Sequence, residues 1–126
     1  MDITPSVPAG SQVINAYGGG QFRVGGAVHE GSVLVWPDRC QAWPAQDASH
    51  VTLDSLAPLF AGGGAAAAIL LVGCGPRFVL EPAGLRADLR GRGVVLEWMD
   101  TGAACRTFNV LLTEGRDVAA ALLAVE

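Results

Sequence analysis

The amino-acid sequence predicts a single α/β domain, in which an N-terminal β-meander precedes a partly parallel sheet with helical crossovers. Two observations support this. Short runs of Val, Ile and aromatic residues, separated by glycines and prolines, fill the first third, and strand and helix patterns then alternate over residues 55–125. A chain of 126 residues is too short for two ordinary domains. We therefore expect one domain over 12–126, preceded by a flexible arm at 1–11.

The first third is expected to form five short strands, because glycine pairs and a Pro-Asp turn interrupt its apolar runs. The interruptions fall at residues 18–20, 25–26 and 37–38. Such closely spaced strands favour a meander. The expected strands cover residues 13–17, 21–24, 27–29, 33–36 and 41–43.

The middle of the chain changes to a helical period. Leucines at 53, 56 and 59 predict a helix over 55–61 with Asp54 as its N-cap. Pro58 would then be the fourth helical residue, where a proline is tolerated because the N–H at that position has no partner within the helix. After glycines at 62–64, the apolar run 66–73 predicts a central strand covered on both faces. The uncharged stretch 55–76 is long enough to span a membrane, but five glycines and Pro58 oppose one helix, so we expect no transmembrane segment.

The last third continues the alternation. Pro82 suits the first position of a second helix that ends near Gly91, and residues 94–98 form the next strand. A longer helix starts at Asp100-Thr101 and runs to about Thr113. Residues 118–125 fit either a helix or a strand; the strand is favoured because residues 114–117 are typical of a helix end followed by a turn.

Composition excludes several functions. The net charge of −4 argues against nucleic acid, and the absence of lysine excludes a Schiff base or a P-loop. Three cysteines, Cys40, Cys74 and Cys105, lack zinc spacing and indicate reduced thiols. The first twelve residues lack the features of a secretory signal. We expect a cytoplasmic protein with no metal or cofactor.

Candidate chemistry lies where two strands end. The strand at 66–73 ends in Gly73-Cys74-Gly75, and the strand at 94–98 ends where Asp100 and Thr101 open the longest helix. If these strands are parallel neighbours, their carboxyl ends share a rim on which an anion or carboxylate would bind. Arg106 and Asn109 extend this candidate crevice along a polar stripe of the same helix.

Each of these residues also has a structural explanation. Glycines permit tight turns, Asp100 or Thr101 caps the helix, and Arg106 is a solvated side chain. Cys105 would be a thiol nucleophile at the first helical turn, but its position favours core packing, and neither His29 nor His50 is placed as its base. We therefore predict no catalytic residue.

Five blocks together resemble the domain of unknown function 498 family, also called the Mth938-like domain. The similarity spans roughly residues 12 to 124, and its most specific part is Met99 to Leu111 with the trailing Glu114-Gly115-Arg116. The blocks are Tyr17 to Val24 (YGGGQFRV), Gly31 to Leu34 (GSVL), Trp43, Leu70 to Gly75 (LLVGCG) and Glu97 to Leu111 (EWMDTGAACRTFNVL).

The resemblance implies a three-layer α/β domain with a mixed central sheet whose last strand runs antiparallel. It carries no catalytic residue, and the eukaryotic branch includes a mitochondrial assembly factor for respiratory complex I. Two departures from the family pattern are Cys74, where threonine is usual, and Phe108, where tyrosine is common. The composition resembles that of a bacterial relative.

Three hypotheses follow. The first is a non-enzymatic protein that binds unknown protein partners and assists the assembly of a membrane respiratory complex. The alternative is a small-molecule or anion-binding protein, including a thiol-dependent one, that uses the strand-end crevice. The third is a homo-oligomeric structural module whose meander edges pair with one another.

Overall fold

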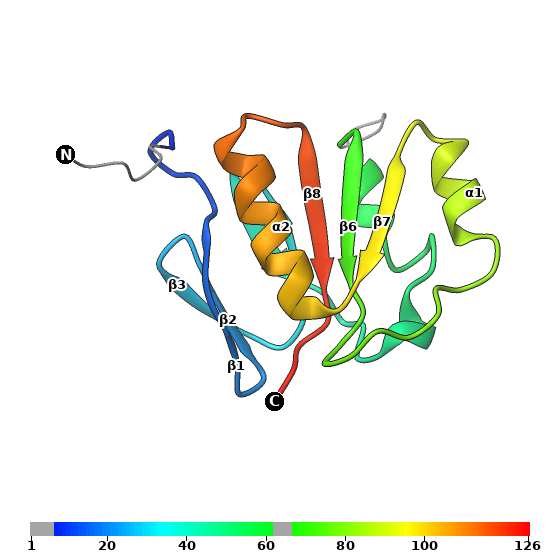
Figure 1. Cartoon of the computed structure of the whole chain (residues 1–126), viewed down its shortest axis with the longest axis horizontal. Helices are drawn as coiled ribbons and strands as arrows, with labels where there is room; N and C mark the ends of the chain where they lie inside the picture. The colour runs from blue at the N-terminus through cyan, green and yellow to red at the C-terminus, as the bar shows by residue number, and fades with distance from the viewer. Residues whose placement is uncertain (1–6, 62–66) are drawn as a thin grey trace.

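A five-stranded mixed sheet forms the middle of the molecule (Figure 1). The computed structural model describes residues 7–61 and 67–126. The strands lie in the order β5-β4-β8-β6-β7, and β6 is parallel to both of its neighbours, whereas β4 is antiparallel to both of its own. These strands are β4 (Val33–Trp36), β5 (Arg39–Ala42), β6 (Ile69–Gly73), β7 (Val95–Met99) and β8 (Val118–Leu122).

The direction of the last strand agrees with expectation against one neighbour only. β8 is antiparallel to β4, as the resemblance implied, but it is parallel to β6. The reason is the connection through α2 (Thr101–Thr113), which follows β7. A helical crossover returns the chain to the edge where the previous strand began, so the strand after it runs parallel. Residues 118–122 do form a strand, which confirms the choice between strand and helix.

The expected five-stranded meander divides between two sheets. β1 (Ile14–Gly18), β2 (Gln21–Val24) and β3 (Ala27–Glu30) form a separate antiparallel sheet, called the meander sheet here. The β4–β5 hairpin instead joins the central sheet. β5 begins at Arg39, earlier than expected, because a two-residue turn at 37–38 brings Arg39 opposite Trp36.

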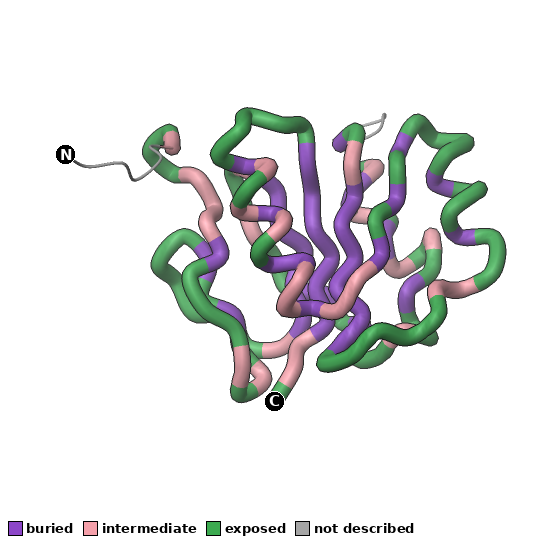
Figure 2. The backbone as a smooth tube through the Cα atoms, viewed as in Figure 1, coloured by how far each residue is buried: buried purple, intermediate pink, exposed green. Residues whose placement is uncertain are grey.

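The domain has three layers. The meander sheet and α2 cover one face of the central sheet, while α1 (Leu85–Arg90) and the 3₁₀ turns η1 (Ala48–His50) and η2 (Ala57–Phe60) cover the other. Because side chains alternate along each strand, β8 contributes to both cores, and all five of its residues are buried (Figure 2).

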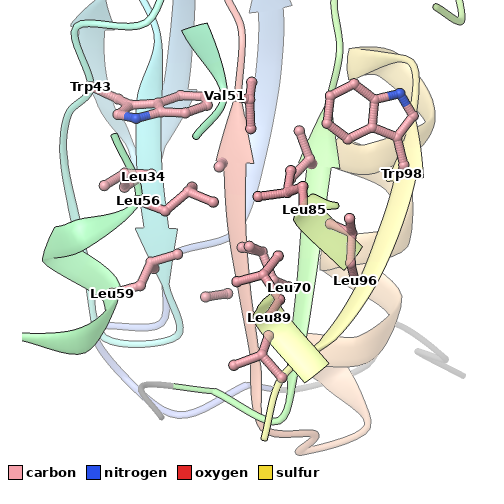
Figure 3. Close-up of a cluster of buried hydrophobic side chains, with 14 of the residues drawn as sticks. Leu34, Trp43, Val51, Leu56, Leu59, Leu70, Leu85, Leu89, Leu96 and Trp98 are labelled. Carbon is pink, nitrogen blue, oxygen red and sulfur yellow. The ribbon is translucent and has the colours of Figure 1, made fainter. Parts of the chain in front are cut away.

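The core beneath α1 collects leucines and tryptophans from distant parts of the chain (Figure 3). Leu85 and Leu89 of α1 meet Leu70 of β6, while Leu56 and Leu59 close the opposite side. Of the leucines expected on a helical face, Leu56 and Leu59 are therefore buried and Leu53 is half-buried, although they do not form an α-helix.

The predicted helix over 55–61 is wrong. Thr52 and Ser55 exchange side-chain and backbone hydrogen bonds of 2.9 to 3.0 Å, which hold a turn where the helix would start. The chain then continues with i→i+3 bonds, including 2.9 Å from the Leu59 N–H to the Leu56 carbonyl, and this is 3₁₀ geometry. Pro58 lies in the first turn of η2.

Two further boundaries differ. α1 begins at Leu85 and not at Pro82, because Gly84, with φ of 83°, turns the chain immediately before it. The predicted strand 66–73 starts at Ile69 within the described residues; its first residue, the glycines at 62–64 and positions 1–6 of the predicted arm lie outside them. No helix in residues 7–61 or 67–126 has the length and apolar character needed to cross a bilayer.

Truncation of Leu89 tests whether α1 is an integral layer. Leu89→Ala removes a fully buried side chain from this core and should lower the free energy of unfolding by about 3 kcal/mol. Leu80→Ala, at a residue that is 84% exposed, is the matched control and should change it by less than about 0.5 kcal/mol. Urea unfolding followed by tryptophan fluorescence measures both; equal losses would contradict this packing.

Candidate functional site

The two strand ends of the candidate crevice lie side by side. β6 and β7 are parallel neighbours, and Gly73 is paired with Met99 at their carboxyl ends. The ladder continues past the strands, because the Cys74 N–H donates to the Met99 carbonyl over 2.8 Å. The prediction that both junctions share one rim is thus correct.

Thr101 joins the two junctions directly. Its N–H donates to the Gly75 carbonyl over 2.9 Å, and its Oγ1 accepts the Gly75 N–H over 3.0 Å. The same hydroxyl donates to the Leu123 carbonyl just after β8, over 2.8 Å. Thr101 is 0% exposed, so these bonds form out of contact with water.

Gly73 fits against Thr101 because it has no side chain. A Cβ at Gly73 would lie 2.8 Å from the Thr101 Cα and 3.1 Å from Leu122 Cδ2. The helix therefore approaches the end of β6 as closely as a glycine allows. The polar groups of Gly75 and Thr101 bind each other, so the hypothesis of an anion or carboxylate site here receives no support from this geometry.

Asp100 caps α2. Its Oδ1 accepts the Ala103 N–H over 2.9 Å, which satisfies one of the free donors of the first helical turn. Cys74 is buried beside this rim, and its thiol lies 3.5 Å from the Arg77 carbonyl as a weak hydrogen bond. Both residues have contacts within the chain that account for their positions.

Arg106 and Asn109 face the meander sheet instead of the rim. The Asn109 amide accepts the Ile14 N–H over 2.8 Å and donates to the Ile14 carbonyl over 2.9 Å, as a neighbouring strand would do. Arg106 is exposed, with its Nη1 3.5 Å from the Tyr17 hydroxyl. The candidate residues thus separate into a rim group and a pair that docks α2 on β1.

Burial raises the thiol pKa of two of the three cysteines. Cys105 is 2% exposed, and desolvation raises the pKa of its thiol to about 12 despite the nearby Arg106. Desolvation likewise raises the pKa of half-buried Cys40 to about 11. Neither thiol is ionised near neutral pH, as a nucleophile would need to be. Across the described ranges 7–61 and 67–126, no three His, Cys, Asp or Glu side chains are grouped so that they could hold a metal ion.

Sequence reasoning missed two surface features. The first is an apolar loop of Phe78, Val79 and Leu80, called the 78–80 loop here, in which Phe78 is 60% exposed. The available signal was three consecutive apolar residues outside any periodic pattern, two residues after the glycine turn at 73–75. The second is a groove of about 460 Å³ between α2 and β7. The residues that line this α2–β7 groove are Ile69, Leu71, Val95, Glu97, Met99, Thr107, Leu111 and Arg116.

Substitution of Thr101 tests the junction. Thr101→Val keeps the shape but leaves the Gly75 N–H and the Leu123 carbonyl without their buried partner, so it should lower the unfolding free energy by about 2 to 4 kcal/mol. Thr101→Ser keeps the hydroxyl and loses only a methyl group, at about 1 kcal/mol. Chemical denaturation compares the two; a larger loss in the serine variant would show that the hydroxyl is not the important group.

Alkaline pH tests the burial of Cys105. The unfolded thiol ionises near 9.0 and the folded one near 12, so the folded state retains the proton over this interval and its stability falls as pH rises. The stability of the wild type relative to Cys105→Ala should fall by up to about 1.4 kcal/mol per pH unit above pH 9. Cys40 is common to both and cancels; a difference independent of pH would refute the assignment.

Comparison with curated proteins gives relatives that match across almost the whole domain. An uncharacterized protein of Rhodobacter capsulatus is 42% identical over 115 residues, which cover 91% of this chain and 86% of that protein. The zebrafish (Danio rerio) NADH dehydrogenase (ubiquinone) 1 alpha subcomplex assembly factor 3 is 33% identical over 123 residues, covering 98% of this chain and 70% of that protein.

Solved structures show the same fold. A Bordetella pertussis protein described as a Mth938-like domain is 32% identical, with a TM-score of 0.78 over 98% of this chain and 92% of that one. A protein of Bartonella henselae described as an outer membrane protein is 36% identical, with a TM-score of 0.83 over 94% and 98% of the two chains. The model of the family described as proteins of unknown function DUF498/DUF598 matches residues 14–123, and the chain belongs to that family.

Proposed function

We propose that this chain is a non-enzymatic interaction protein that assists the assembly of a membrane respiratory complex from the cytosolic side. The observation that carries the proposal is the similarity to assembly factor 3, which extends over nearly every residue of the domain. The match covers 98% of this chain at 33% identity, so it supports a related role for the whole domain and not for a single motif.

The chemistry of the described residues supports an interaction role. Cys105 is buried with a raised pKa, and Thr101 and Asn109 use their polar groups to join elements of the fold. An assembly factor needs surfaces that recognise a subunit and release it, and such surfaces need no nucleophile or general base.

The 78–80 loop is suited to such contacts. Leu80 and Phe78 expose large apolar side chains, and exposed apolar patches commonly mark protein interfaces. The loop is held in place, because Trp98 Nε1 donates to the Val79 carbonyl over 2.7 Å. A loop that is already fixed loses little conformational entropy when a partner binds, so more of the contact energy contributes to affinity.

Deletion and complementation in the organism that encodes the chain test the proposal. Loss of the gene should reduce the amount of assembled respiratory NADH dehydrogenase, measured by native electrophoresis of membranes with in-gel NADH oxidation. Wild-type chain should restore it. The double variant Phe78→Ser with Leu80→Ser should restore less than half at equal protein level, because it removes the exposed apolar contacts of the loop.

The control is Val28→Thr, which changes another half-exposed apolar residue, on β3 of the meander sheet. It should complement like wild type. Unchanged levels of the assembled complex after deletion would overturn the proposed function. Full complementation by the loop double variant would show that the 78–80 loop is not needed for the assembly role, and the assembly role itself would still stand.

A further inference from the structure

One face of the central sheet is incompletely covered. α2 packs through its buried residues on Leu71, Val118 and Leu122, which belong to β6 and β8. β7 is the edge strand beyond β6, and Figure 1 shows β8 and β6 between it and α2, so the helix does not extend over β7. Parallel strands are normally covered on both faces, so this edge lacks a layer.

The α2–β7 groove occupies this place. Its floor is the outward row of β7, formed by Val95, Glu97 and Met99, and one wall is the flank of α2 at Thr107 and Leu111. Val95 is 55% exposed, so the groove opens along its length to solvent, unlike the enclosed pockets that bury most of a small ligand. An open apolar channel beside a helix is the shape that receives a second helix.

The length of the groove floor sets the length of helix that it could hold. From Val95 to Met99 the strand rises about 13 Å, at about 3.3 Å per residue. A helix rises about 1.5 Å per residue, so about nine helical residues would lie along this floor. Two to three turns supply apolar side chains at i, i+3 and i+7 on one face, which matches the apolar lining of the groove.

Two charges mark positions along the groove. Arg116 lies at the level of Val95, because the next residue accepts the Ile69 N–H and Ile69 is paired with Val95. Glu97 lies two residues further along β7, about 6.6 Å away along the strand. Arg116 has only a loose ion pair with Glu114 at 3.9 Å, and Glu97 has no ion pair within the described residues.

The face of β7 is open to a partner, but its free edge is not available for the addition of another strand. Arg86 Nη1 donates to the outward Leu96 carbonyl over 2.6 Å, and the guanidinium is held by two bonds to Glu81, of 2.7 and 3.0 Å. A charged side chain over an edge carbonyl prevents a further strand from pairing there. A partner is therefore directed to the face of β7 and away from its edge.

We infer that the α2–β7 groove binds an amphipathic helix of a partner protein, with a basic side chain facing Glu97 and, one turn away, an acidic side chain facing Arg116. The spacing follows from the two charges, since about 6.6 Å along the strand corresponds to about four helical residues. This deepens the proposed function and rests on it, because it names the kind of segment that the assembly role would recognise.

The test uses two synthetic helical peptides of about 14 residues, stabilised by a side-chain staple because short helices are marginal in water. Both carry leucines at i, i+3 and i+7. The first has Lys and Glu four residues apart beside that face, and in the second this Lys is replaced by Glu. Titration into ¹⁵N-labelled chain should shift the amides of residues 95–99 and 107–116, and the second peptide should bind about fivefold more weakly.

Variants of the chain test whether Glu97 causes the difference in affinity between the two peptides. Glu97→Lys should reverse the preference between the two peptides, whereas Asp88→Lys, the same charge change on the exposed surface of α1, should leave it as in wild type. Equal binding of both peptides, absence of shifts in the groove, or concentration-dependent shifts there without peptide would each overturn the inference; the last would assign the groove to a second copy. None of these outcomes depends on complex assembly in cells, so the proposed function would stand or fail separately.

Discussion

The buried hydroxyl of Thr101 is the interaction on which the arrangement of this domain depends. It accepts from the loop after β6 and donates to the backbone after β8, while its own residue begins α2. Three segments far apart in sequence therefore meet at one side chain. Gly73 makes the approach possible, since any larger residue would collide with the backbone of the helix. A buried polar group with all its partners present fixes one packing arrangement, because any other leaves those partners unsatisfied.

This junction changes where function is to be sought. In open sheets with parallel strands, ligands usually bind beyond the carboxyl ends of the strands. Here that region is a direct connection between loop, helix and strand. Two features that remain open to a partner are the 78–80 loop and the α2–β7 groove, which lie on either side of β7. Both present apolar side chains on backbone that is held by the surrounding secondary structure, and both suit recognition of another protein.

Much of the fold could be predicted from the sequence because local signals and tertiary packing agreed. The helix from Thr101 to Thr113 combined an N-cap, an apolar stripe and a terminal glycine, and it was predicted at its observed bounds. The segment 55–61 was different, since its leucine spacing suits a 3₁₀ turn as well as an α-helix and the Thr52–Ser55 bonds decided the matter. Strand direction at β8 depended on which strands were neighbours, and no local pattern carries that information.

The geometry of the candidate site was predicted where it followed from local strand order, and not where it depended on the packing of distant elements. The meeting of residues 73–75 with Asp100 and Thr101 followed from parallel strands and was correct. The positions of Asn109 and Arg106 depended on where the meander sheet packs, and sequence spacing along one helix does not reveal which other element it faces.

The most direct test of the account is hydrogen exchange of the chain alone and in the presence of the proposed partner, an assembly intermediate of the respiratory complex. The account predicts added protection at residues 78–80 and 95–99, with the amides of Gly75 and Leu123 protected equally in both states. Added protection confined to residues 73–75 and 100–103 would contradict it, because the rim would then be the binding site.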